Sequence, residues 1–264
     1  PLSSPAQAHS DAASAHLRAA IAAASGWLPF DHWMAEALYA PGLGYYAAGN
    51  VKLAEPDADG RTPAGDFVTA PQLTPLFART LARQAAQVLR QTGTHTVLEF
   101  GAGTGALAEG VLRELDALGL ADTQYLILEV SADLRARQAE RLAPFGARVQ
   151  WLDALPQHFR GCVLANEVLD AMPVSLFTWS ADGKVLERGV AVDAEQGFVW
   201  EDRPASPRLA AAVAARMPAL PGYVSEINLQ GEAWINAMGA WLEHGAALLV
   251  DYGFPRSEYY HPQR

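Results

Sequence analysis

The pattern of apolar positions changes near residue 96, where helical spacing gives way to short apolar runs separated by amphipathic segments. Before that point, apolar residues recur at intervals of three and four, which predicts two short helices and then a longer one over 75–92. Residues 1–12 are polar and aperiodic, and we expect a frayed tail there. The pattern therefore separates an N-terminal tail and helical lid region, residues 1–93, from a core over 94–264.

Strands and helices alternate in the first part of this core. Such alternation predicts a parallel sheet with helices on both faces, which is a doubly wound α/β fold. In such sheets, ligands bind beyond the carboxyl ends of the strands. Strands are expected at 96–100, 124–130, 147–152 and 161–166, with helices at 105–118 and 131–142.

The alternation stops after the fourth strand. Residues 174–201 contain short apolar runs joined by turn residues, which predicts antiparallel strands that form an insertion outside the parallel sheet. Two helices follow at about 206–216 and 229–244, and the apolar run over 246–253 predicts a fifth core strand. A doubly wound sheet of this type normally continues further, so we expect C-terminal strands to be missing from this chain.

Three glycines at alternate positions connect the first core strand with its helix. Gly101, Gly103 and Gly105 allow positive φ angles, close approach of a ligand, and close packing of the strand on the helix. With Ala102 between them, they are typical of a loop that binds a nucleotide cofactor. The same spacing fits the dinucleotide pattern G-x-G-x-x-G/A, with Ala106 in the last place, so a nicotinamide-dependent dehydrogenase stays open as an alternative.

The charge around this loop bears on which cofactor it binds. Glu99 precedes the first glycine by two residues and would repel a pyrophosphate, and the loop has no Lys or Arg to compensate. S-adenosylmethionine has no phosphate, but it carries a sulfonium and an ammonium group that Glu99 would attract. The charge therefore favours S-adenosylmethionine over a dinucleotide.

Two further acids follow the second and third core strands. Glu129 lies 24 residues after Gly105, where an acid commonly accepts hydrogen bonds from both ribose hydroxyls of an adenosine cofactor; the alternative is a solvated acid at a strand end. Asp153 could accept a hydrogen bond from the adenine amino group, or it could cap a turn. We count Val130, directly after Glu129, among the candidate cofactor-binding residues.

An amide and two carboxylates follow the fourth strand. Glu167 and Asp170 could bind a planar guanidinium through paired hydrogen bonds, hold it in line with a methyl donor, and favour the loss of its proton. We assign Asn166 both to this catalytic group and to the cofactor-binding residues. The alternative is that Asn166 and Asp170 cap the turn while Glu167 faces solvent.

Several residues of the N-terminal region are candidates for a lid or for the substrate side of the pocket: Tyr45, Tyr46, Phe67 and Thr69. For Trp33, we favour packing of a helical layer on the sheet. The histidines show no metal-ligand spacing, so we assign no metal.

Composition limits the classes of partner. A formal net charge of −10 disfavours nucleic acid, which requires a basic surface, whereas a protein partner is compatible with it. The single cysteine, Cys162, excludes an internal disulfide. No apolar run approaches the length of a membrane span, and the N-terminus lacks the pattern of a signal peptide. We therefore expect a cytoplasmic protein without a membrane partner.

Five segments carry a family resemblance when they are taken together: Gly44-Tyr45-Tyr46, then residues 65–71, 99–105, 166–173 and 249–253. The most specific are the patterns Asn-Glu-x-x-Asp-Ala-x-Pro and Gly-Asp-Phe-x-Thr. From about Phe30 to the C-terminus, the chain resembles the MidA-type family of class I S-adenosylmethionine-dependent methyltransferases. Eukaryotic members of that family are mitochondrial complex I assembly factors that methylate an arginine on a complex I subunit.

The resemblance implies a Rossmann-like, seven-stranded class I methyltransferase sheet, S-adenosylmethionine as cofactor, and a protein arginine as methyl acceptor. One departure is Ala70-Pro71-Gln72, where family members generally have Ser-Pro-Glu. The alanine-rich composition indicates a bacterial source, and a bacterial member can have a different acceptor. A non-catalytic assembly or interaction factor that binds S-adenosylmethionine remains the alternative.

Overall fold

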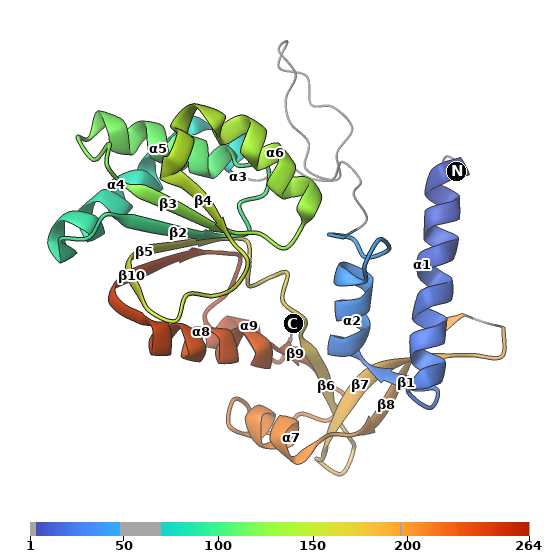
Figure 1. Cartoon of the computed structure of the whole chain (residues 1–264). Coiled ribbons are helices and arrows are strands. Elements are labelled where there is room, and N and C mark those ends of the chain that lie inside the picture. The colour runs from blue at the N-terminus through green and yellow to red at the C-terminus, as the bar shows by residue number, and fades with distance from the viewer. Residues whose placement is uncertain (1–3, 48–69, 196, 264) are drawn as a thin grey trace. The chain divides into compact units, whose positions relative to one another are not determined.

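A computed structural model describes residues 4–47, 70–195 and 197–263 of the chain (Figure 1). The chain divides into two compact units. The parallel-sheet unit comprises residues 49–170 and 235–251, and the antiparallel-sheet unit comprises residues 1–48, 171–234 and 252–264. This division differs from the predicted boundary at residue 93, because the helix before that residue packs with the parallel sheet.

The first unit contains a five-stranded sheet in the order β10-β5-β2-β3-β4, and every neighbouring pair is parallel. The chain starts in the middle, runs outward to β4, and then returns to the other side of β2. The connections that leave the neighbouring strands β2 and β5 therefore run toward opposite edges of the sheet. Such a point, where the strand order reverses, is the switch point at which sheets of this type bind ligands. The strands are β2 (Thr96–Phe100), β3 (Gln124–Leu128), β4 (Val149–Leu152), β5 (Phe159–Asn166) and β10 (Leu242–Val250).

The helices of this unit begin and end where their capping residues indicate. Thr74 caps the first turn of α4 by accepting a hydrogen bond from the backbone N–H of Leu76 at 3.2 Å, and Gly93 ends the helix with φ +63°. Ser131 caps α6 in the same way. The elements are α3 (Ala70–Leu73), α4 (Pro75–Thr92), α5 (Ala106–Ala117), α6 (Ala132–Leu142) and the short 3-10 helix η1 (Ala143–Arg148).

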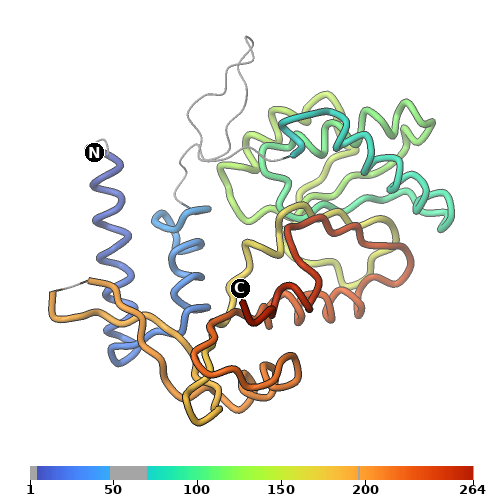
Figure 2. The backbone as a smooth tube through the Cα atoms, turned by 180° about the vertical axis from the view of Figure 1, so that it is seen from behind, coloured from blue at the N-terminus to red at the C-terminus, as the bar shows by residue number. Residues whose placement is uncertain are grey.

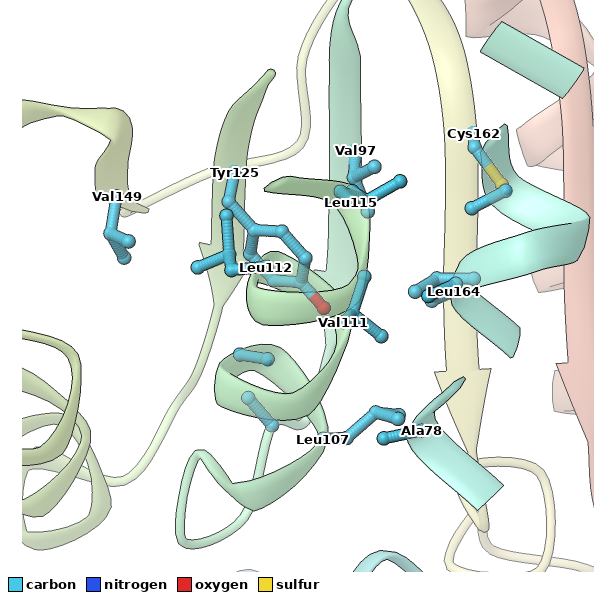
Figure 3. Close-up of a cluster of buried hydrophobic side chains, with 14 of the residues drawn as sticks. Ala78, Val97, Leu107, Val111, Leu112, Leu115, Tyr125, Val149, Cys162 and Leu164 are labelled. Atoms are coloured by element: carbon cyan, nitrogen blue, oxygen red, sulfur yellow. The ribbon is translucent and has the colours of Figure 1, made fainter. Parts of the chain in front are cut away.

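Helices cover both faces of the parallel sheet, as predicted. On one face, α4 and α5 bury alanines and leucines against β2, β3 and β5, and the Tyr125 ring lies beside Leu112 of α5 (Figure 3). On the other face, the Trp241 ring lies 6.2 Å from the ring of Phe100 and 6.1 Å from that of Phe159, measured between centroids. Trp241 is the last residue of α8 (Leu229–Trp241).

The second unit is built on an antiparallel sheet, which confirms the strands predicted for the segment after the fourth core strand. The sheet also includes β1 and β9, which the sequence analysis did not predict as strands; β1 pairs with β7, and β9 pairs with β6. Its strands are β1 (Trp27–Pro29), β6 (Ser175–Trp179), β7 (Val185–Val192), β8 (Phe198–Pro204) and β9 (Val224–Ile227). The remaining helices here are α7 (Pro207–Ala214) and α9 (Arg256–Tyr259).

The prediction of a frayed tail over residues 1–12 is wrong from Ser4 onward. Helix α1 (Ser4–Ala23) begins there and lies beside α2 (Phe30–Tyr39), as the views from both sides show (Figures 1 and 2). The His16 imidazole lies 2.7 Å from the Glu36 carboxylate between these helices. Alanine has the highest helix propensity, and its frequency in this segment outweighs the polar residues.

Within the parts of the chain that the structure describes, no helix combines the length and the apolar character that crossing a membrane would require.

Candidate cofactor site and catalytic turn

The glycine loop has the backbone that its sequence predicts. Gly101, Gly103 and Gly105 adopt φ angles of +60°, +55° and +80°, a region in which residues with a side chain are strained. The Gly105 N–H donates to the Ala102 carbonyl at 2.8 Å, and Gly105 is the N-cap of α5. The loop therefore begins at the carboxyl end of β2 and ends at the N-terminus of α5, which is the positive pole of that helix.

Another helix packs beside Gly105. A Cβ atom at this position would lie 3.5 Å from both Cα and Cγ of Gln138 and 3.5 Å from Cδ of Arg141, two residues of α6. Gly101 has more room, since a Cβ there would meet only Val168, at 3.6 Å. Both are ordinary van der Waals distances, so the positive φ angles, and not a lack of space, favour glycine at these two positions, and Gly101 is exposed and so open to a ligand.

Glu129 follows β3 at the ligand edge of the sheet, and only 7% of its surface is exposed. Its Oε1 accepts a hydrogen bond from the Ser131 N–H at 2.9 Å, and its Oε2 accepts one from Nε2 of Gln138 at 3.0 Å. Burial raises the pKa of Glu129, and these hydrogen bonds oppose that rise. The alternative of a solvated acid is wrong, and each oxygen keeps a further lone pair with which to accept from a ribose hydroxyl.

Glu99 lies deeper, with 2% of its surface exposed. The Tyr125 hydroxyl donates to its Oε2 at 2.6 Å. Burial raises the pKa of Glu99 to about 7; the bond from Tyr125 lowers it, and the charge of Glu129 raises it further. Two buried acids that repel each other create a negative potential near the loop, which a cationic ligand would relieve and a pyrophosphate would increase.

One basic residue does reach the glycine loop, although the loop sequence contains none. An Nη of Arg141 donates to the Thr104 carbonyl at 3.2 Å and to the Thr104 hydroxyl at 2.9 Å, and its Nε lies 3.5 Å from the Glu109 carboxylate. Tertiary packing therefore supplies, from α6, a positive charge that the loop sequence itself lacks. The pairing of Arg141 with Glu109 offsets this charge locally.

Val130 and Asp153 follow neighbouring strands, β3 and β4. Val130 is 81% exposed, and so offers an apolar surface that the flat ring of a base could cover. An Oδ1 of Asp153 accepts a hydrogen bond from Arg135 at 2.7 Å, and this carboxylate is otherwise open to solvent. The contact of Asp153 with adenine, and the role of Val130 as a cofactor-binding residue, remain predictions.

The turn after β5 brings Asn166, Glu167 and Asp170 to the same edge of the sheet as the loop. Glu167 has φ +52°, which is unusual for a residue with a side chain and costs free energy that the surrounding structure must offset. Its N–H donates to the Val250 carbonyl at 2.8 Å, and its Oε1 lies 3.4 Å from Nδ2 of Asn166. The turn is also capped by a side chain from the end of another strand.

That cap is Asp251, directly after β10, to which the sequence analysis assigned no role. Its Oδ2 accepts hydrogen bonds from the backbone N–H groups of Leu169, at 2.8 Å, and Asp170, at 3.2 Å. Burial raises the pKa of Glu167, the Asn166 amide lowers it, and the charges of Asp170 and Asp251 raise it. The sequence signal for this capping role was the position of Asp251, directly after a strand that is parallel to β5 and next to it.

The predicted lid residues do not all fall within the described chain, because Phe67 and Thr69 lie outside it. Tyr45 and Tyr46 belong to the antiparallel-sheet unit, where the ring of Tyr46 stacks on that of Tyr39 at 5.6 Å. The Trp33 ring stacks on Phe30 at 5.8 Å, which confirms a packing role for Trp33, although the sheet concerned is the antiparallel one.

Among the residues with a described position, no group of three or more His, Cys, Asp or Glu side chains is arranged to hold a metal ion.

Comparisons with known proteins agree with this geometry. Residues 80–264 match the model of a family described as S-adenosyl-L-methionine-dependent methyltransferases. A crystal structure from Burkholderia thailandensis with S-adenosyl-homocysteine bound is 50% identical, with a TM-score of 0.90, and the match covers 100% of this chain and 68% of that one. A second, native structure from the same organism is 48% identical, with a TM-score of 0.88, over 100% of this chain and 67% of that one.

Two curated relatives are mitochondrial proteins. The Drosophila melanogaster homolog of protein arginine methyltransferase NDUFAF7 is 28% identical over 90% of this chain, and NDUFAF7 of Danio rerio is 27% identical over 90%. The chain spans 59% and 61% of the lengths of these two relatives.

The family match covers more than half of the chain and removes the basis for the nicotinamide alternative, since the family's cofactor is S-adenosylmethionine. It also confirms the Rossmann-like fold that the parallel sheet displays. The chain belongs to the MidA-type family of class I S-adenosyl-L-methionine-dependent methyltransferases.

Proposed function

We propose that this protein transfers a methyl group from S-adenosylmethionine to an arginine side chain of another protein. The observation that carries the proposal is the cluster of carboxylates at the catalytic turn, where Glu167 has a strained φ of +52° and where burial, and after it the charges of Asp170 and Asp251, raise its pKa. A guanidinium is a planar cation that pairs with carboxylates through parallel hydrogen bonds. A cationic acceptor would relieve the repulsion among these acids.

The residues at the loop fit the cofactor. Glu129 is buried, oriented by two hydrogen bonds, and able to accept from ribose hydroxyls. Glu99 adds negative charge for the cationic groups of the cofactor, and the open backbone at Gly101 allows close approach. When bound, S-adenosylmethionine supplies an electrophilic methyl group on a sulfonium.

The acceptor side requires both orientation and the removal of a proton. A guanidino nitrogen attacks the methyl carbon as the carbon–sulfur bond breaks, so the bond electrons go to sulfur, and the acceptor nitrogen must lose a proton. Glu167 is suited to accept that proton, because a raised pKa makes its carboxylate a stronger base than an exposed glutamate. Asp170 would hold the remaining charge of the guanidinium in place.

The names of the relatives support the finer part of the proposal. Both curated relatives are named protein arginine methyltransferases, at 28% and 27% identity. The net charge of −10 favours a basic protein segment as acceptor.

The direct test is methyl transfer from radiolabelled S-adenosylmethionine to proteins of a cell extract, with S-adenosylhomocysteine binding measured in parallel by calorimetry. We expect the wild-type protein to label a protein band and to yield methylarginine after hydrolysis. Glu167→Gln should bind S-adenosylhomocysteine normally and lose at least 100-fold in labelling, on the order of the contribution of general-base catalysis. Glu243→Gln is the control, because Glu243 pairs with His158 at the amino end of the sheet.

Three outcomes separate the alternatives. Label recovered on another amino acid would overturn the arginine acceptor while it preserves the methyltransferase. Wild-type protein that binds the cofactor product but labels no protein would favour the non-catalytic assembly factor. Full activity in Glu167→Gln would remove Glu167 from the mechanism.

A further inference from the structure

Gln138 is a polar side chain with no exposed surface, on the side of α6 that packs against the glycine loop. Its Nε2 donates to the Gly103 carbonyl at 2.9 Å and to Oε2 of Glu129 at 3.0 Å. Its Oε1 accepts from the indole N–H of Trp151 at 2.8 Å. One buried amide therefore connects α6 with the loop, with the end of β3, and with β4.

The chemistry of its partners fixes the orientation of this amide. The indole of Trp151 can only donate, while the Gly103 carbonyl and an ionised Glu129 can only accept. A rotation of the amide by half a turn would lose all three hydrogen bonds. A buried network in which every member is paired in this way holds a single geometry.

The network restrains Glu129 on both of its oxygens. Gln138 holds Oε2 and the Ser131 N–H holds Oε1, so the carboxylate cannot rotate without losing a bond. Both bonds lower the pKa of Glu129 against the effect of burial. They therefore favour the ionised form, which is the better acceptor for two ribose hydroxyls.

The loop is restrained from the same helix. Gln138 holds the Gly103 carbonyl, and Arg141, three residues later on α6, holds the Thr104 carbonyl and hydroxyl. Gly105 lies beside the same two residues, since a Cβ built on it would be 3.5 Å from both Gln138 and Arg141. Two adjacent carbonyls of the loop are thus fixed by α6 rather than by the strand or by α5.

We propose that Gln138 is a positioning residue for the cofactor: it aligns Glu129 with the glycine loop and so determines affinity for the adenosine part of S-adenosylmethionine. This inference rests on the cofactor of the proposed function but not on the methyl acceptor. Gln138 has no role in the transfer step itself, so its loss should change binding and leave turnover at saturating cofactor nearly unchanged.

The test is Gln138→Met, which keeps the length of the side chain and removes its hydrogen bonds. The matched control is Thr123→Val, which also removes the hydrogen bond of a side chain with no exposed surface, from the Thr123 hydroxyl to the Leu120 carbonyl at 2.8 Å, but at the amino end of β3. Calorimetry should show S-adenosylhomocysteine binding about tenfold weaker in Gln138→Met and unchanged in Thr123→Val.

A second measurement distinguishes positioning of Glu129 from a general loss of stability. The 2′-deoxy analogue of S-adenosylhomocysteine lacks one hydroxyl that Glu129 would bind, so the wild-type protein should prefer the natural ligand. In Gln138→Met this preference should shrink several-fold, and in Thr123→Val it should not change. If Gln138→Met does not fold, Trp151→Phe, which removes the indole N–H that orients the Gln138 amide, should show a smaller loss of the same preference.

Equal affinity and an unchanged preference in a folded Gln138 variant would overturn the inference. Wild-type protein that failed to bind S-adenosylhomocysteine would overturn both this inference and the proposed function. Wild-type protein that binds the ligand but methylates nothing would overturn only the proposed function, and a weakened Gln138→Met would then still support the positioning role.

Discussion

Tyr125 donates a hydrogen bond of 2.6 Å to Glu99 in the interior of the parallel-sheet unit, between neighbouring strands β2 and β3. Both side chains are almost completely buried. Burial raises the pKa of both groups, and the phenol keeps its proton, so the proton that titrates near neutral pH is that of Glu99. This pair connects the stability of the sheet with the charge at the cofactor loop.

The first prediction concerns stability as a function of pH. The native state keeps the Glu99 proton up to about pH 7, whereas the unfolded chain loses it near 4.5. Because the native state binds more protons between these values, the contribution of Glu99 to the free energy of unfolding is present below pH 4.5 and is lost as pH rises to 7 and beyond. The loss is about 3 kcal/mol.

Urea unfolding of the wild type and Glu99→Gln at pH 5 and pH 8 measures this contribution. Glutamine still accepts from Tyr125 and does not titrate, so the variant should lose less stability between the two pH values than the wild type does. Parallel losses in the two proteins would show that Glu99 does not titrate in this range.

The second prediction concerns cofactor binding by the same residue. If Glu99 attracts the sulfonium and ammonium groups, its ionisation should strengthen the binding of S-adenosylmethionine between pH 6 and pH 8. We expect a gain of roughly three- to tenfold in the wild type and no gain in Glu99→Gln, as measured by calorimetry. A gain of equal size in the variant would assign the pH dependence to another group.

The third prediction compares the same backbone strain inside and outside the cofactor loop. Gly105 and Gly119 have φ +80° and +79°, but a Cβ on Gly119 would meet no atom within 4 Å. Alanine should therefore cost about 1–2 kcal/mol of stability through backbone strain at either position. Only Gly105→Ala should also weaken S-adenosylhomocysteine binding, because only there does the strain fall on the cofactor loop. Equal affinities in the two variants would show that the backbone conformation at Gly105 does not shape the site.

The fourth prediction concerns Asp251 and the catalytic turn. Asp251→Ala would leave the N–H groups of Leu169 and Asp170 without this acceptor, and the strained φ of Glu167 without this support. Turnover should fall tenfold or more while S-adenosylhomocysteine affinity is preserved. Steady-state methylation assays with parallel calorimetry measure both, and equal losses of turnover and affinity would point to a general loss of structure.

Asp251→Asn provides the accompanying pH test. The amide oxygen can still accept from the turn. Burial and the charge of Asp170 still raise the pKa of Glu167, but the further rise due to the charge of Asp251 is gone. The acidic limb of the pH–rate profile should therefore shift to lower pH. A profile that does not move would indicate that a group other than Glu167 controls this limb.

Local patterns predicted those parts of the fold in which a residue's neighbours in sequence are also its neighbours in space. The strand that ends at Phe100, the turn at Gly101 to Gly105, and the cap of α4 at Thr74 are examples. Periodicity and glycine backbone preferences act over a few residues, so the sequence displays them directly. The same local reasoning wrongly predicted a frayed tail over residues 1–12. From Ser4 onward the chain is helical, because helix propensity outweighed polarity.

By itself, the sequence determined the parallel arrangement of the core strands, the glycine loop, and the set of acids at the strand ends, because each depends on local residue chemistry. Only the tertiary structure decided that Asp251 caps the turn at Leu169, 82 positions earlier, and that Gln138 joins Gly103 to Glu129. An isolated Gln or Asp has many possible partners along the chain. The order of strands and the packing of α6 select among them, and these depend on contacts between segments that the linear pattern does not pair.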